Sequence, residues 1–236
     1  MYKRQDLGLI PIAALTPELR IVPGCTIASL ERVRSIQLVV KGSGGLAGVR
    51  TVAADTASRS SVAYAQVLFR HFVGTDPEFR PARADAEAML EGADAALLIG
   101  DPALLALERR GEIEARVGVC EWIDVAAEWK ARTGLPWVAA VWAVRPEAVA
   151  SSEARRCLIE DLNLSREHGV AHVEELVREW EPRIALPAAT IRTYLTENIH
   201  YALDEGCVKA LGEFRRLAAK VGALPELGAL QFLGFR

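Results

Sequence analysis

Short apolar runs alternate with amphipathic helical stretches over residues 1–140. Continuous apolar runs are typical of strands covered on both faces, and they lie at residues 7–11, 20–22, 35–40, 49–54, 95–99, 117–119 and 138–144. Between them, apolar residues recur with a helical period at residues 60–72, 84–91, 102–110 and 125–133. This alternation of strands and helices predicts an α/β fold built on parallel sheet.

Beyond Arg145 the pattern becomes helical, with predicted helices at residues 147–164, 166–180, 187–198 and 204–221. The strands at 35–40 and 138–144 each lie where the pattern switches. A chain that crosses between two lobes and returns needs two such connections. We therefore predict two lobes, residues 1–40 with 140–236, and residues 41–139. Ligands of two-lobed α/β proteins bind between the lobes.

Composition narrows the function classes. Hydrophobic residues make up 51% of the chain and charged residues 25%, which indicates a folded, soluble protein. The 28 Lys and Arg residues nearly balance the 31 Asp and Glu residues, so the formal net charge is -3. A chain this close to neutral has no general attraction for nucleic acid or an anionic membrane. An anionic ligand would need a local site.

Several special-purpose classes are disfavoured. No apolar stretch reaches the roughly 18 residues of a membrane-spanning helix. Four cysteines without a CxxC pair argue against a zinc cluster or a disulfide framework and favour a reducing, cytoplasmic compartment. His168 and His172 lack a nearby third ligand, so we expect no metal site. Four glycines precede a strand instead of following one, so we interpret them as a linker and not as a dinucleotide-binding loop: Gly42, Gly44, Gly45 and Gly48. The sequence does not determine the oligomeric state.

The segment DTASRSS at residues 55–61 is the strongest candidate for a binding site. It follows the strand at 49–54 and opens the next helix. A helix N-terminus carries partial positive charge and unpaired N–H groups, so it binds carboxylate or phosphate well. The polar side chains gathered there are Thr56, Ser58, Arg59, Ser60 and Ser61. The alternative is that one serine, Ser58 or Ser60, caps the helix while the other side chains face water.

Two further positions carry weaker signals. Gly100 and Asp101 follow the strand at 95–99, where Gly100 would let a ligand approach the backbone. The alternative is purely structural: Gly100 allows a tight turn and Asp101 caps the helix that starts there. Trp137 begins the strand that would return between the lobes and would cover a cyclic ligand there; core packing is the alternative.

Taken in order, five segments resemble the menaquinone-biosynthesis chorismate dehydratase family of the futalosine pathway. They are RIVPGCTIA (20–28), DTASRSS (55–61), AALLIGDPAL (95–104), residues 129–143 with the run TGLPWVAAVWA, and the tail at residues 198–222, which begins NIHYALDEG. The resemblance implies a two-lobed, periplasmic-binding-protein-like (type II) α/β fold with a helical C-terminal tail. It also implies conversion of chorismate to 3-[(1-carboxyvinyl)oxy]benzoate by loss of water, without metal or organic cofactor. The partner would be a small chorismate-like dicarboxylate.

One departure from the family bears on activity. The family's opening strand and the motif that supplies its catalytic Asn would precede Asp6, and this sequence does not contain them. We therefore expect an N-terminally truncated fold in which the strands at 7–11 and 35–40 lose a neighbour. The catalytic residue stays unassigned, and the activity of the 236-residue chain is an open question. If the substrate is chorismate, as the resemblance implies, Ser58, Arg59, Ser60 and Ser61 suit the role of binding its carboxylates, and Gly100 and Asp101 suit the opposite wall.

Other functions fit the same pattern. The first is the sister lyase of the pathway, which forms dihydroxynaphthoate from a cyclic futalosine derivative and shares the fold. The second is a non-catalytic solute-binding protein for a small organic acid. A regulator's effector lobe would need an attached DNA-binding motif, and no basic recognition helix is visible.

Overall fold

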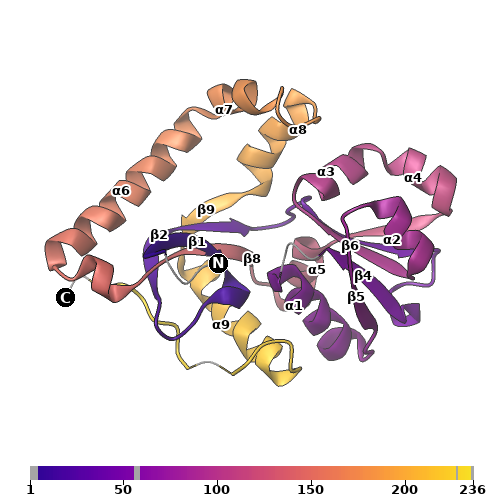
Figure 1. Ribbon diagram of the computed structural model, residues 1–236, viewed down its shortest axis with the longest axis horizontal. Helices are drawn as coiled ribbons and strands as arrows, with labels where there is room; N and C mark the ends of the chain where they lie inside the picture. Colours follow the sequence, from indigo (N-terminus) through magenta and orange to yellow (C-terminus); the bar gives the residue numbers. More distant parts are fainter. Residues whose placement is uncertain (1–4, 56–58, 227, 235–236) are drawn as a thin grey trace.

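The computed structural model describes residues 5–55, 59–226 and 228–234 (Figure 1). In this part of the chain the strands form two sheets that lie side by side in the long direction of the molecule. The four-stranded sheet is antiparallel and contains, in order, β1 (Leu7–Pro11), β8 (Trp137–Val144), β2 (Arg20–Ser29) and β9 (His200–Leu203). We call this sheet and its covering helices the first lobe.

Helices cover both faces of the four-stranded sheet. Alternate residues of β2 point to opposite faces, as in any strand. Ile21 packs in the core that contains α9 (Glu205–Lys220), while Val22 packs with Ile159 of α6 (Ser152–Ala171). Arg166 of α6 also donates a hydrogen bond to the Gly24 carbonyl of β2 at 2.6 Å. The tail therefore returns to the first lobe, as the sequence predicts.

The five-stranded sheet forms the second lobe. Its order is β5 (Glu78–Ala82), β4 (Thr51–Asp55), β6 (Ala95–Ile99), β3 (Ile36–Lys41) and β7 (Cys120–Asp124). Helices α1 (Arg59–Val67) and α5 (Val125–Thr133) cover one face, and the other face is covered by α2 (Ala86–Gly92), α3 (Asp101–Glu108) and α4 (Arg110–Val117). Since β4 runs parallel to β5 and β6, the carboxyl ends of β4 and β6 meet at one edge.

Tyr64 of α1 connects the two lobes. Its ring stacks on Phe214 of α9 at 3.9 Å between centroids, and it contacts Trp129 of α5 at 5.1 Å and Trp137 of β8 at 5.4 Å. The Tyr64 hydroxyl donates to the Val138 carbonyl of β8 at 3.2 Å. These contacts bury the aromatic rings of both lobes in one continuous core.

The chain crosses between the lobes twice, at residues 30–35 and 134–136. Asp124, the last residue of β7, binds the first crossing, because its carboxylate accepts hydrogen bonds from the backbone N–H groups of Val33 and Arg34 at 3.2 and 2.6 Å. The same carboxylate caps α5, which ends at the second crossing with Gly134 in a left-handed conformation. The helix α5 thus fixes both connections.

The tail also reaches the second lobe. From α6 it arches over the molecule through α7 (Val173–Trp180) and α8 (Ala188–Thr193) to α3 (Figure 1). Val177, Leu186 and Ile191 pack against Leu104 of α3, and Thr190 donates a hydrogen bond to Glu108 at 2.8 Å. The helical tail therefore contacts both lobes.

The strand pairing corrects three sequence predictions. The sheets are not parallel throughout: only β4–β5 and β4–β6 pair that way, because β3 enters from the other lobe without an intervening helix. The run at 35–40 is not the first crossing and does not belong to the first lobe; it forms β3, which pairs with β6 and β7. Consequently β3 has two neighbours, and the expectation that it lacks one is wrong; β1 lies at one edge of the four-stranded sheet. The other predicted lobe boundaries stay predictions.

Other elements differ in their bounds: the strand predicted at 20–22 continues to Ser29 in β2, and α6 spans the predicted break between the helices at 147–164 and 166–180. The run at 117–119 is not a strand, since Val117 ends α4 and β7 begins at Cys120. Hydrophobic periodicity also misses β5 and β9, which contain no fully buried residue and carry a weak apolar signal. None of the helices in the described part of the chain is long and apolar enough to cross a membrane.

We predict that Asp124→Ala destabilises the fold more than the loss of a simple helix cap. The substitution leaves several backbone N–H groups at the crossing and at the start of α5 without an acceptor, each costing about 1–3 kcal/mol if it stays buried. Chemical denaturation measures the change. Asp85→Ala is the matched control, since Asp85 accepts one hydrogen bond as the cap of α2 and its loss costs about 1 kcal/mol. Equal losses for the two variants would contradict this role for Asp124.

Candidate functional site

The predicted anion-binding segment lies at the start of α1, between the lobes. Thr56 and Ser58 fall outside the described residues. Arg59 is the first residue of α1 and is exposed, whereas Ser60 and Ser61 are only 3% and 2% exposed. The described part of the segment therefore contains one exposed guanidinium, two buried hydroxyls at a helix N-terminus and the buried carboxylate of Asp55 at the end of β4.

Ser60 joins the segment to the first lobe. Its hydroxyl oxygen accepts a hydrogen bond from the backbone N–H of Ala13 at 3.1 Å. Ala13 belongs to the short 3-10 helix Ile12–Ala14 that follows β1. A hydroxyl that accepts one bond still has a proton to donate. Ser60 is thus an interlobe contact, and it is compatible with ligand binding as well.

The second predicted loop lies at the same sheet edge. Gly100 precedes α3 with a positive φ of 65°, a conformation that glycine adopts without strain, and its N–H donates to the Ser35 carbonyl at 2.7 Å. Asp101 is the first residue of α3 and is exposed. Gly100, rather than Asp101, occupies the cap position. Because β4 and β6 are adjacent and parallel, this loop and α1 emerge side by side; a ligand role for Gly100 and Asp101 stays a prediction.

Trp137 lies in the core. It is 1% exposed and its ring packs on Tyr64, which favours the core-packing alternative for the ring. Its indole Nε1, however, has no hydrogen-bond partner among the described residues. Sequence reasoning found the residue but could not reveal this unpaired donor.

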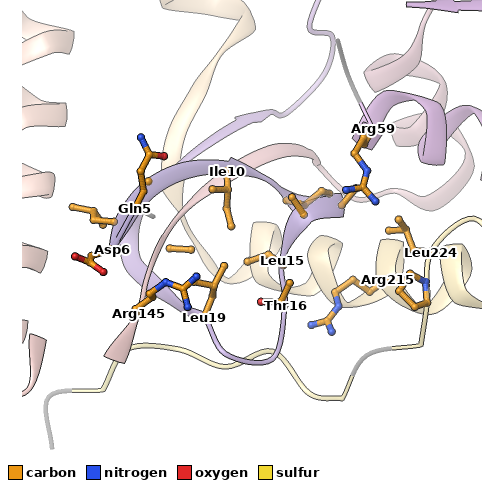
Figure 2. Close-up of a pocket in the computed structure, with 17 residues that line it drawn as sticks. Gln5, Asp6, Ile10, Leu15, Thr16, Leu19, Arg59, Arg145, Arg215 and Leu224 are labelled. Atoms are coloured by element: carbon orange, nitrogen blue, oxygen red, sulfur yellow. The ribbon is translucent and has the colours of Figure 1, made fainter. Parts of the chain in front are cut away.

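A cavity of about 470 Å³ opens next to the start of α1 (Figure 2). It extends along β1 and is bounded by the segment that follows β1 and by α9. Most of its walls are apolar, with Leu7, Ile10, Leu15, Leu19 and Leu224 among the lining side chains. An apolar cavity with a few polar groups is the usual form of a small-molecule site.

Three guanidinium groups give this cavity its charge. Arg59, Arg145 and Arg215 all line it (Figure 2), and none of the three forms an ion pair with a carboxylate in the described part of the chain. Burial lowers the pKa of Arg215, whose guanidinium donates to the Gly228 carbonyl. Asp6 is a carboxylate on the same wall. The excess of positive charge suits an anionic ligand with an apolar body.

Sequence reasoning missed Arg145 and Arg215. Arg145 directly follows the apolar run at 138–144, so the sequence placed it at the end of a strand. Arg215 lies inside a regular amphipathic helix, where nothing distinguishes it from other polar residues. Neither belongs to a motif. Only the packing of β1, β8 and α9 against one another brings them to the cavity that Arg59 lines.

The described residues offer one cluster with metal-ligand chemistry. Potential ligand atoms of His200, Asp204 and Cys207 all lie within 4.8 Å of one another. Asp204 already accepts a hydrogen bond from the Cys207 N–H and lies 2.8 Å from His200 Nε2. Burial raises the pKa of Cys207 to about 12, which keeps the thiol protonated. The geometry is that of a capped helix start.

The predicted histidine pair has no such cluster around it. The rings of His168 and His172 stack at 4.0 Å between centroids. In the described ranges, no group of three metal-ligating side chains includes either histidine.

Comparisons with known proteins agree on one family. A family model described as menaquinone biosynthesis matches residues 2–220. A chorismate dehydratase from Thermus thermophilus is 31% identical over 195 residues, which cover 79% of this chain and 69% of the relative.

Solved structures confirm the fold class. Protein AF1704 from Archaeoglobus fulgidus superposes with a TM-score of 0.66 at 20% identity, covering 94% of this chain and 81% of its own. A Candida albicans protein that exhibits the generic periplasmic-binding-protein fold superposes with a TM-score of 0.61 at 11% identity, covering 97% and 80%. The predicted periplasmic-binding-protein-like α/β fold is therefore confirmed.

We predict that Ser60→Ala lowers the free energy of unfolding by about 1–3 kcal/mol, because the Ala13 N–H then lacks its acceptor at a part-buried contact. Urea unfolding of the two proteins measures this difference. Ser165→Ala is the control, since Ser165 is exposed on α6 and such a change stays within about 0.5 kcal/mol. An unchanged stability of Ser60→Ala would show that the contact does not hold the lobes together.

Proposed function

Because this chain belongs to the menaquinone biosynthesis family, we propose that it is a chorismate dehydratase. The observation that carries the proposal is the relative of that name, which shares 31% of its residues with this chain over most of the length. The charge of the site supports it. Chorismate is a dicarboxylate with a six-membered ring, and the start of α1 and the adjoining cavity offer guanidinium groups beside apolar walls.

The reaction is an elimination of water from the substrate ring. One ring C–H bond and the ring C–OH bond break, the electron pair of the C–H bond forms a ring double bond, and the proton and hydroxide leave as water. The product, 3-[(1-carboxyvinyl)oxy]benzoate, has an aromatic ring, so much of the driving force lies in the substrate. The protein must orient the carboxylates, exclude water and offer polar groups at the reacting atoms.

Within this proposal Arg59, Ser60 and Ser61 bind a substrate carboxylate. Arg59 supplies a charged, two-pronged donor and the serines supply neutral donors at the positive end of α1. None of these three side chains is a base at neutral pH, and a carboxylate of the substrate itself fits that role. The catalytic residue stays unassigned.

The finer assignments follow from the same proposal. The enzyme would be a carbon–oxygen lyase of the hydro-lyase type in the futalosine pathway, with a small dicarboxylate as its partner. All four cysteines are free, three of them buried, which fits a reducing compartment; we therefore place the enzyme in the cytoplasm.

Incubation of the chain with chorismate tests the proposal. We expect chorismate to be consumed and an aromatic product lighter by one water to appear, followed by ultraviolet absorbance and mass spectrometry. Release of dihydroxynaphthoate from a cyclic futalosine derivative would indicate the sister lyase instead. Tight binding of an organic acid without turnover would indicate a solute-binding protein.

We predict that Arg59→Ala weakens chorismate binding roughly ten- to a hundredfold, since a hydrogen bond to a charged group contributes about 1.5–3 kcal/mol. The affinity of Arg59→Lys for chorismate should lie between those of the wild-type protein and Arg59→Ala, because lysine keeps the charge but not the two-pronged geometry. Calorimetric titration measures all three proteins. Arg156→Ala is the matched control, because Arg156 is an exposed arginine of α6. Equal affinity of Arg59→Ala and Arg156→Ala would remove Arg59 from the site.

A further inference from the structure

Two buried polar atoms without partners lie opposite each other at the end of the first-lobe sheet. Ser29 ends β2 and Trp137 begins β8, and the two residues are direct antiparallel partners. Each is 1% exposed. The Ser29 hydroxyl and the Trp137 indole N–H have no hydrogen-bond partner within the described ranges. Buried polar groups without partners are rare in folded proteins and call for an explanation.

Both side chains lie on the face of the sheet that packs against α1. Directly paired residues of antiparallel strands project to the same face of the sheet. The Trp137 ring contacts Tyr64 of α1, so Ser29 points to the α1 side as well. On a helix, residues three and four apart share a face, which places Ser60 and Ser61 one turn before Tyr64, on the buried side of α1. Buried polar side chains of the first-lobe sheet and of α1 therefore lie on the two sides of the same interface.

We propose that Ser29 and Trp137 form, with Ser60 and Ser61, an inner polar subsite that receives a carboxylate oxygen of the ligand. This assignment rests on the proposed function and adds two residues to it. The indole N–H is a donor only, and the hydroxyls of Ser29 and Ser60 can each donate, so these groups match a ligand atom that only accepts hydrogen bonds. A carboxylate is such an acceptor, and the positive end of α1 favours its charge.

The lobe arrangement explains how a ligand reaches this position. Ser29 and Trp137 belong to the first lobe, while Ser60 and Ser61 belong to the second. The hydrogen bond between the Ala13 N–H and Ser60 Oγ joins the start of α1 to the segment that follows β1. Opening of this contact admits the ligand, and closure then surrounds the carboxylate with donors and excludes water.

The subsite predicts that binding and stability respond in opposite directions. In the unliganded protein Ser29→Ala removes a hydroxyl that has no hydrogen-bond partner among the described residues, so the melting temperature should be unchanged or higher. The same variant should bind the ligand roughly ten- to a hundredfold more weakly, as expected for a lost hydrogen bond to a charged group. Trp137→Phe, which keeps an aromatic ring but not the N–H, should weaken binding by a similar factor.

Thr26→Val is the matched control. Thr26 lies on the same strand and is as deeply buried, but its hydroxyl donates to the Ala140 carbonyl at 2.8 Å. Its loss should lower the melting temperature and leave ligand affinity unchanged. A lower melting temperature with unchanged affinity for Ser29→Ala would overturn the proposal, because it would give Ser29 the same structural role as Thr26. The result for Ser29→Ala decides the matter if Trp137→Phe fails to fold.

Two probes separate this inference from the proposed function. Calorimetric titration uses chorismate and isophthalate, an aromatic dicarboxylate that cannot lose water. If the wild-type chain binds isophthalate, does not convert chorismate, and the variants bind more weakly, the subsite stands and the dehydratase proposal falls. If the chain converts chorismate and the variants bind both probes like wild type, the subsite falls and the dehydratase proposal stands. Binding of neither probe by the wild-type chain overturns both.

Discussion

The packing of Tyr64 is the interaction on which the arrangement of the lobes depends. One ring from α1 contacts aromatic rings of α9, α5 and β8, which are brought together from distant parts of the sequence. Burial raises the pKa of the Tyr64 hydroxyl and keeps it a neutral donor to the Val138 carbonyl. Since a buried aromatic ring and its hydrogen bond fix both position and rotation, α1 has one defined orientation between the lobes.

The defined position of α1 creates the site. One turn before Tyr64, the same helix presents Ser60 and Ser61 to the interior and Arg59 to the cavity of Figure 2. The helix end adds its own partial charge to that of the guanidinium groups. A chain with a net charge of only -3 therefore concentrates positive charge and hydrogen-bond donors at one place.

Two further contacts limit how the lobes can move. Asp124 binds the first crossing to the start of α5, whose end leads into the second crossing. The tail packs α6 against β2 and α8 against α3, so it bridges the lobes away from the crossings. The hydrogen bond between the Ala13 N–H and Ser60 adds a further contact between α1 and the first lobe.

The sequence by itself determined the fold class, most of the elements and the segment at 55–61 as a candidate site. Local signals carried these predictions: continuous apolar runs for β6 and β8, and a serine- and arginine-rich helix start for α1. The motifs also carried the family resemblance, which the matching family model confirms. Such signals lie within a few residues of one another, so a pattern along the chain can reveal them.

Tertiary structure alone decided which segments meet. The apolar run of β3 is compatible with a strand of either lobe. Only its pairing with β6 and β7 shows that it belongs to the second lobe. Arg145 and Arg215 are unremarkable in sequence and reach one cavity because β8 and α9 pack together. The unpaired atoms of Ser29 and Trp137 likewise follow from register and burial. Contacts between residues far apart in sequence depend on the packing of the whole chain, and no local pattern encodes them.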